Sequence, residues 1–135
     1  MWIKKTETIW IDDDAKIDGK IMFKEGKLLI TVNAGTIIMG TVDIGEGVLI
    51  AQNCSIVSSS HGIVLGKPIR QQDTINKRVT IEDNIWIGAG SIILGGCHLK
   101  EGCVIGAGSL LLEDTKVGEN EIWVGHPAKF LKMRI

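Results

Sequence analysis

The sequence has no excess of either charge and no long apolar run. Lys and Arg total 15 against 16 Asp and Glu, which gives a net charge of -1. Nucleic-acid-binding domains carry a clustered basic surface, so this balance argues against general nucleic-acid binding. No apolar segment approaches the about 20 residues of a membrane-spanning helix, and the charged start is unlike a signal peptide. We therefore predict a cytoplasmic protein with no nucleic-acid partner and no membrane span.

Cysteine is also scarce, and its number and spacing argue against a disulfide framework and against a metal site. Cys54, Cys97 and Cys103 are odd in number and lack the close spacing of metal ligands. All three occupy the same position of a six-residue repeat. We interpret them as small buried side chains in a reducing compartment, and we predict no metal site.

What the sequence does contain is an aliphatic residue at every sixth position. The unbroken series is Ile75, Ile81, Ile87, Ile93, Leu99, Ile105, Leu111 and Val117. A period of six matches neither a helix nor an alternating strand, and one hexad is too short to bury a face alone. We therefore predict an all-β solenoid of short parallel strands, with three hexads per coil and coils about 4.8 Å apart.

Other positions of the hexad are restricted as well. The fifth position shares the interior, so it should hold a small or slim residue, and it holds Val79, Ile85, Ser91, Cys97, Cys103, Ser109 and Thr115. The second to fourth positions contain glycine or Asp-Asn, as in Asp83-Asn84 and Gly95-Gly96. These residues suit tight corners that need unusual backbone angles.

The repeat is less regular before residue 75. A first series contains Ile11, Ile17, Phe23 and Leu29, and a second contains Val32, Ile38, Ile44, Ile50 and Ile56. Ile56 and Ile75 are 19 residues apart, one more than three hexads. We therefore predict that residues 62–76 form a loop ejected from the solenoid, a place where function is often found.

The end of the chain breaks the hexad pattern. Pro127 is followed by Ala128, Lys129 and further residues that favour helix, so we predict a short C-terminal helix over residues 126–135. Phe130 and Leu131 on one side of it would cover the open strand edges of the last coil. The predicted organisation is thus one β-helix domain, residues 1–125, followed by this helix.

Three motifs resemble the hexapeptide-repeat acyltransferases. They are IEDNIWIGAGS at residues 81–91, VIGAGS at 104–109 and GHPAK at 125–129. The most similar group is the galactoside, maltose and polysaccharide O-acetyltransferases. The resemblance implies a left-handed parallel β-helix, acetyl-CoA as acyl donor, and a homotrimer with active sites between subunits.

The resemblance implies roles for four side chains. His61, directly before the predicted loop, matches the general base of the family. A neutral imidazole can accept the proton of a sugar hydroxyl as that oxygen attacks a thioester carbonyl. Trp86 is expected beside the acceptor and the thiol end of the cofactor, and Lys129 with Lys132 near the nucleotide phosphates.

Small residues repeat at the coil spacing of 18. Gly88 and Ala89 should stack against Gly106 and Ala107, leaving a smooth strip for the pantetheine arm, with corner N–H groups available to an oxyanion. Small corner residues also serve the fold itself. Leu112 stands in the cofactor-binding region where relatives often have the first residue of a Thr-Lys pair, so one cationic contact to the cofactor is missing.

The acceptor is less clearly indicated. Thr31 and Met39 stand where polar residues hold galactoside in the family, which favours a polysaccharide precursor or surface sugar instead. Acceptor contacts are expected from the loop, at Arg70 or Asp73, and from the first coils of a neighbouring subunit.

Three alternatives stay open. The scaffold could acetylate the amine of an amino sugar, or it could be a non-catalytic assembly module. It could also be a gamma-type carbonic anhydrase, which needs three histidines around zinc. The chain has three, His61, His98 and His126, but lacks the closely spaced pair of that family.

Overall fold

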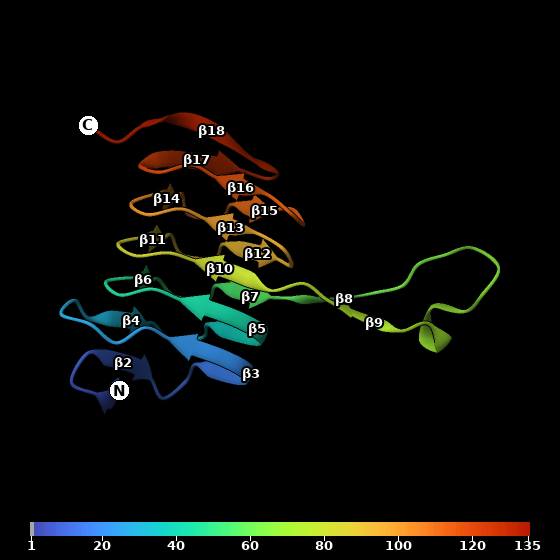
Figure 1. Cartoon of the computed structure of the whole chain (residues 1–135), viewed down its shortest axis with the longest axis horizontal. Helices are drawn as coiled ribbons and strands as arrows, with labels where there is room; N and C mark the ends of the chain where they lie inside the picture. Colours follow the sequence, from blue (N-terminus) through green and yellow to red (C-terminus); the bar gives the residue numbers. More distant parts are fainter. Residues whose placement is uncertain (1) are drawn as a thin grey trace.

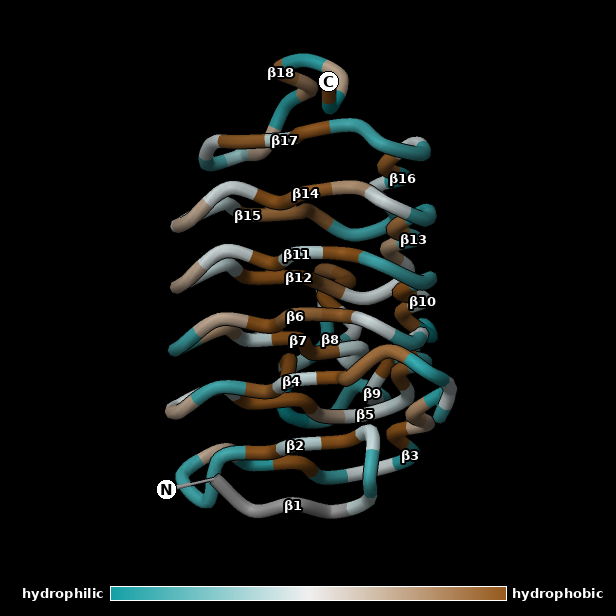
Figure 2. Tube along the Cα trace, turned by 90° about the vertical axis from the view of Figure 1, so that its left-hand side faces the viewer, coloured by the Kyte–Doolittle hydropathy of each residue, from teal (hydrophilic) through white to brown (hydrophobic). Residues whose placement is uncertain are grey.

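The chain winds into a parallel β-helix of about five coils (Figure 1). The computed structural model describes residues 2–135, with side chains from residue 6 onward. Equivalent residues of successive coils are eighteen apart, as in the pairs Ile81 and Leu99 or Ile87 and Ile105. The predicted coil of three hexads is therefore confirmed. Figure 2 shows the coils stacked one above another, with hydrophobic residues recurring at matching places.

The coils form a prism with three faces. Face 1 contains β2 (Ile9–Asp12), β4 (Ile30–Val32), β6 (Leu49–Ile50), β11 (Trp86–Ile87), β14 (Val104–Ile105) and β17 (Glu121–Gly125). Face 2 contains β7 (Ser55–Val57), β12 (Ile92–Leu94) and β15 (Leu110–Leu111). Face 3 contains β10 (Val79–Ile81), β13 (His98–Leu99) and β16 (Lys116–Val117). Two longer strands, β3 (Lys16–Phe23) and β5 (Ile37–Ile44), pass from face 2 to face 3 and turn at Gly19 and Gly40, both at positive φ.

Antiparallel strands close both ends of the prism. β1 (Trp2–Thr6) pairs with β2, and β18 (Ala128–Met133) pairs with β17. The predicted C-terminal helix is therefore wrong. A lone helix of this length is marginal, whereas a strand satisfies the open hydrogen-bonding edge of β17 directly. Phe130 and Leu131, predicted to cover the last coil, remain 51% and 55% exposed in this strand.

The core follows the predicted series closely from Val32 onward, whereas Ile17 and Phe23 of the first series are only partly buried and Leu29 and Ile75 are exposed. The inward residues from Ile81 to Val117 and from Val32 to Ile56 are at most 1% exposed. Leu29, however, is 46% exposed and Ile30 takes its place, because the first coil has three extra residues and pairs Ile9 with Ile30. Ile75 is 43% exposed, because it lies outside the prism in the inserted segment.

A left-handed backbone conformation recurs at fixed points of the corners. Between faces 3 and 1 it occurs at Gly47, Asn84, Gly102 and Asn120, and between faces 1 and 2 at Gly35, Asn53, Gly90 and Gly108. Side chains with a Cβ rarely adopt positive φ, and Asn and Asp tolerate it best. The corner glycines and Asp-Asn pair therefore mark the ends of the strands, as the sequence predicts.

The inserted segment is a β-hairpin that projects from the prism (Figure 1). Its strands β8 (Ser59–His61) and β9 (Thr74–Asn76) are antiparallel, and the 3-10 turn η1 (Ile69–Gln71) lies beyond them. The hairpin leaves the prism at Ser58 and returns at Lys77, whose N–H donates to the Ser58 carbonyl at 2.9 Å. It thus begins three residues before the predicted loop. Within residues 2–135 there is no helix long and apolar enough to cross a bilayer.

The three cysteines are free and buried, which leads to a prediction about pH. Burial raises the pKa of the Cys97 thiol to about 11 and that of Cys103 to about 12, from an ordinary value of 9.0, and it also raises the pKa of Cys54. Because only the unfolded chain ionises these thiols readily, stability should be full below pH 9 and should fall as the pH rises toward 12. Denaturant midpoints between pH 7 and 11 measure this effect. Rapid modification of the folded protein by a disulfide reagent at pH 8 would contradict it.

Candidate functional site

The corner between faces 1 and 2 carries a strip of small residues, the Gly–Ala corner. Gly88 and Ala89 lie against Gly106 and Ala107 of the next coil, and the Gly108 N–H donates to the Ala89 carbonyl at 2.8 Å. A Cβ added to Gly88 would lie 2.5 Å from the Ala107 nitrogen, so only glycine fits there without backbone movement. The strip therefore presents backbone and methyl groups to solvent.

The strip continues upward to the last two strands. A Cβ on Gly106 would lie 2.5 Å from Cγ1 of Val124, the residue that pairs with Lys129 in β18. Lys129 is exposed, and so is Lys132, which pairs with Ile122. One cation, Lys129, thus lies on the capping strand above the strip, at a position open to an anionic ligand, whereas Lys132 lies at the other end of face 1, on the side of Val104.

Trp86 lies on face 1, beside the strip, and is 51% exposed. It lines a groove of about 440 Å³, the Trp86 groove, whose walls are Gly47, Leu49, Asn84, Ile85, Trp86, Val104 and Arg134. Sequence reasoning missed Arg134, because it follows the last hexad and no period places it. Its position depends on the pairing of β18 with β17.

His61 and Leu112 lie at a different corner, between faces 2 and 3. His61 ends β8 opposite Thr74 and is exposed, and Leu112 is 49% exposed directly after β15. Lys77, at the base of the hairpin, bonds Glu113 at 3.2 Å and Asp114 at 2.9 Å. The hydrogen bond to Asp114 raises the pKa of the Lys77 ammonium, which keeps it charged. Within one chain the predicted residues therefore form two groups, at opposite edges of face 2.

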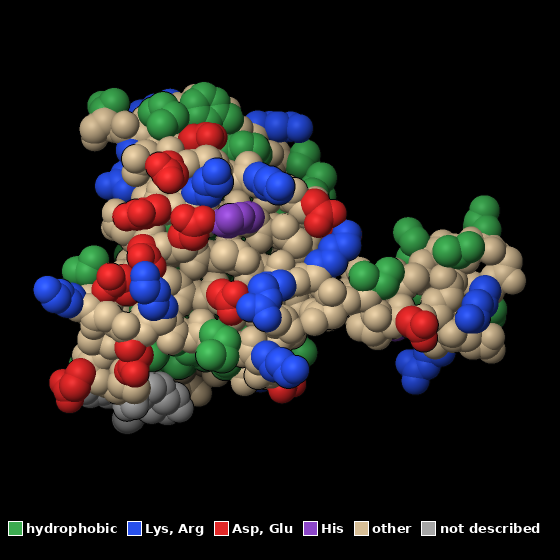
Figure 3. All heavy atoms as spheres, in the orientation of Figure 1, with side chains coloured by type: hydrophobic (Ala, Val, Ile, Leu, Met, Phe, Trp, Pro, Cys, Tyr) green, Lys and Arg blue, Asp and Glu red, His purple; other side chains and the backbone are tan. Residues whose placement is uncertain are grey.

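The outer surfaces of faces 2 and 3 differ in character. On face 2 the outward side chains include Ile92, Leu94 and Leu110, each half-buried within the single chain. On face 3 acidic and basic side chains gather around a histidine, as Figure 3 shows. A row of apolar side chains on an outer face is typical of a surface that meets another protein.

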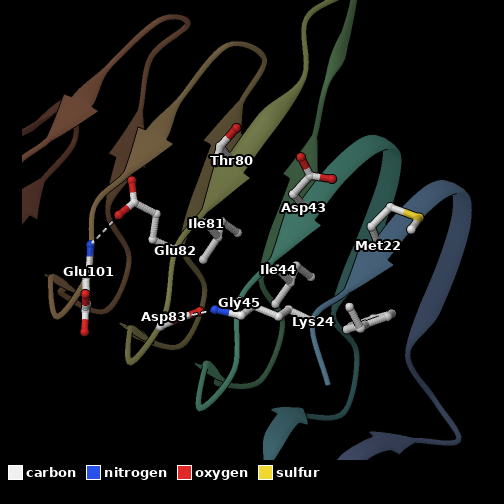
Figure 4. Close-up of a pocket in the computed structure, with 11 residues that line it drawn as sticks. Met22, Lys24, Asp43, Ile44, Gly45, Thr80, Ile81, Glu82, Asp83 and Glu101 are labelled. Carbon is white, nitrogen blue, oxygen red and sulfur yellow. Dashed lines mark hydrogen bonds and ion pairs between the residues drawn. The ribbon is translucent and has the colours of Figure 1, made fainter. Parts of the chain in front are cut away.

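A larger cavity of about 510 Å³ lies on face 3 (Figure 4). Its lining includes the carboxylates of Asp43, Glu82, Asp83 and Glu101 and a single ammonium group, Lys24. Lys24 bonds Asp83 at 2.8 Å, which raises the pKa of Lys24, and Asp43 is paired with Arg78 at 2.6 Å. None of the predicted acyl-transfer residues lines this cavity, so its size alone does not make it the site of chemistry.

The three histidines lie on three separate elements. His98 on face 3 bonds Glu82 through its Nε2, His61 ends the first strand of the hairpin, and His126 lies in the turn between β17 and β18. Among the residues whose side chains are described, no three His, Cys, Asp or Glu groups gather as a metal site would require. The geometry therefore does not bring the histidines to one point in a single chain.

Comparison with known proteins identifies a family and several relatives with similar sequences. Residues 78–113 match the family model described as bacterial transferase hexapeptide (six repeats). The galactoside O-acetyltransferase of Lactococcus lactis is 35% identical over 85 residues, covering 62% of this chain and 39% of that protein. The mitochondrial gamma carbonic anhydrase 2 of Arabidopsis thaliana is 25% identical over 135 residues, covering 92% of this chain and 48% of that protein. The chain thus spans about half or less of the curated relatives it matches.

A solved structure supports the same assignment. The maltose O-acetyltransferase of Clostridium difficile superposes with a TM-score of 0.75 at 26% identity, covering 94% of this chain and 67% of that chain. The fold is accordingly the left-handed β-helix that the motifs predicted. On the repeat, the fold and the acetyltransferase relatives, the chain belongs to the bacterial transferase hexapeptide-repeat family.

Proposed function

We propose that the protein transfers an acetyl group from acetyl-CoA to a hydroxyl group of a sugar or polysaccharide precursor. The observation that carries the proposal is the Gly–Ala corner, where Ala89 and Ala107 are exposed and Gly90 and Gly108 have open space beside them, so that a long thin molecule can lie against backbone. Lys129 above this corner, with Lys132 farther along the same strand, supports binding of the phosphates of such a donor. Since acetyl-CoA is available in the cytoplasm, we place the activity there.

The reaction we propose is a direct attack. The acceptor oxygen bonds to the thioester carbonyl carbon while His61 takes the hydroxyl proton, and backbone N–H groups at the Gly–Ala corner stabilise the oxyanion. The carbon–sulfur bond then breaks, CoA leaves as thiolate and receives the proton from His61. Trp86 on face 1 would hold the reacting ends together.

This chemistry requires more than one copy of the chain. His61 and the Gly–Ala corner lie at opposite edges of face 2 in a single chain, so a complete site would combine the hairpin of one copy with the corner of the next. The apolar outer surface of face 2, with Ile92, Leu94 and Leu110, supports a homotrimer in which this face is covered. Copies related by rotation would then form three equivalent sites.

Titration of acetyl-CoA into the purified protein tests the proposal. We expect saturable binding near one site per chain, and about tenfold weaker binding in Lys129→Glu, where a carboxylate replaces a cation near the donor phosphates. Lys116→Glu makes the same charge change at an exposed position of face 3 and should bind like the wild type. Absence of binding to the wild type would favour a non-catalytic assembly module instead.

The acceptor atom is the second question. The same strip and hairpin would serve an amino sugar, whose amine needs less help from a base than a hydroxyl does. An ester product is cleaved by neutral hydroxylamine and an amide product is not. Cleavage of the labelled product would support O-acetylation, and resistance would support N-acetylation.

A further inference from the structure

The Trp86 groove differs in charge from the larger cavity of the molecule. No Asp or Glu lines it, whereas four line the cavity on face 3. Its floor is apolar, with the Trp86 indole 51% exposed and Leu49 43% exposed. Asn84, exposed at the start of the groove, adds an amide that can bond hydroxyl groups. Only Arg134 brings a full charge to the groove.

Arg134 is held in place but not neutralised. Its backbone N–H donates to the Asn120 carbonyl at 2.8 Å, and its Nη1 donates to the Gly102 carbonyl at 2.8 Å. Among the described side chains no carboxylate forms an ion pair with it, and its other guanidinium nitrogens have no partner there. A guanidinium has five N–H donors in a planar fork that matches carboxylate and phosphate oxygens. Hydrogen bonds to two neutral carbonyl groups therefore hold Arg134 in place, and its remaining N–H donors are available to a ligand.

The groove and the Gly–Ala corner lie at opposite ends of the same short strands. β11 and β14 start beside Asn84 and Gly102 and end at Gly88 and Gly106. A donor lying along the Gly–Ala corner, with its phosphates toward Lys129, would leave the Asn84 end of face 1 unoccupied. Trp86 lies between the two ends, where donor and acceptor would meet.

From this arrangement we propose that the Trp86 groove binds the acceptor and that the acceptor is an anionic sugar, a sugar carrying a phosphate or carboxylate group. Arg134 bonds the anion, the Trp86 indole packs against the sugar ring, and Asn84 bonds a hydroxyl group. The assignment rests on the proposed acetyl transfer, and it gives a substrate class to that site. Bidentate pairing to a guanidinium would make the anion a requirement for tight binding.

The test is calorimetric titration of glucose, glucose 1-phosphate and glucuronate into the 135-residue chain without donor. We expect at least one of the anionic sugars to bind tenfold or more tightly than glucose. Arg134→Gln should abolish that preference while changing acetyl-CoA affinity less than twofold. Lys100→Gln removes the same charge from an exposed position outside the groove and should keep the preference. Thermal unfolding of both variants shows whether the β17–β18 cap is intact.

Two results would overturn the assignment. One is an equal or weaker affinity for both anionic sugars compared with glucose. The other is an Arg134→Gln variant that loses tenfold or more in acetyl-CoA affinity while keeping the sugar preference. That result would mean that Arg134 of the wild type binds a phosphate of the donor. Acetyl-CoA binding by the wild type, measured in the same preparation, reports separately on the proposed transfer activity.

Discussion

Replacing His61 with alanine should lower the rate of acetyl transfer by about 10²–10⁴-fold, the range that general-base help typically provides. The side chain is exposed at the end of β8, outside the core, so its removal leaves no cavity in the prism. The melting temperature and the affinity for acetyl-CoA should therefore stay near the wild-type values. Transfer rates, calorimetry and thermal unfolding of the same preparation measure the three quantities.

His98 provides the matched control for this variant. It is a histidine on the same chain, paired with Glu82 on face 3, away from both the hairpin and the Gly–Ala corner. His98→Ala should keep transfer within about twofold of the wild type. If His61→Ala instead loses its oligomeric state or its thermal stability, the residue has a structural role and the base must be sought elsewhere.

Most of the solenoid could be predicted because its information is local and repeated. Each hexad specifies an inward aliphatic residue and a corner, and each corner needs a residue that tolerates positive φ. Asn84 and Asn120 show the rule at its clearest, since they hold the same corner position two coils apart, with φ of 57° and 58°. The same 18-residue spacing predicts the stacking of Gly88 on the coil that carries Ala107.

The errors arose where the outcome depends on distant parts of the chain. Residues 128–133 favour a helix locally, but the open edge of β17 decides in favour of a strand. Ile75 fits the hexad register by coincidence, because an insertion of 19 residues displaces every later position. Arg134 could not be assigned at all, since its contact with Gly102 exists only once β18 has folded back over the last coil.

The strand pairing between coils defines the two residues between which the hairpin can be excised. β5 pairs residue 39 with 57 and residue 42 with 79, so Gly40 corresponds to both ends of the insertion. Replacing residues 58–77 by one glycine would give the coil the same corner that Gly40 forms at φ 98° in the coil below. The core residues on either side, Ile56 and Val79, are untouched. We expect the prism to fold with a melting temperature a few degrees below the wild type, because the bond from the Thr41 N–H to the buried Ser58 Oγ at 2.8 Å is lost together with the exposed ion pairs at Lys77.

Acetyl transfer by this variant should fall at least as far as in His61→Ala, because the proposed base, His61, is removed with the hairpin. The proposed trimer should also weaken, since Ile63, Val64 and Leu65, between 74% and 96% exposed in one chain, are the residues that a neighbouring copy could cover. Sedimentation measures the second effect.

A variant with a shortened hairpin tests the contribution of His61 apart from that of the rest of the insertion. Replacing residues 63–72 by Asn-Gly closes the hairpin with a two-residue turn, beyond the bond from the Gly62 N–H to the Asp73 carbonyl at 3.0 Å. This variant keeps His61 opposite Thr74, so it should retain far more transfer than the full excision. If the two variants are equally inactive, the tip of the hairpin with Arg70 is needed as well as His61. If the full excision remains active, the proton acceptor cannot lie in the hairpin, and the direct-attack mechanism with His61 as base would have to be abandoned.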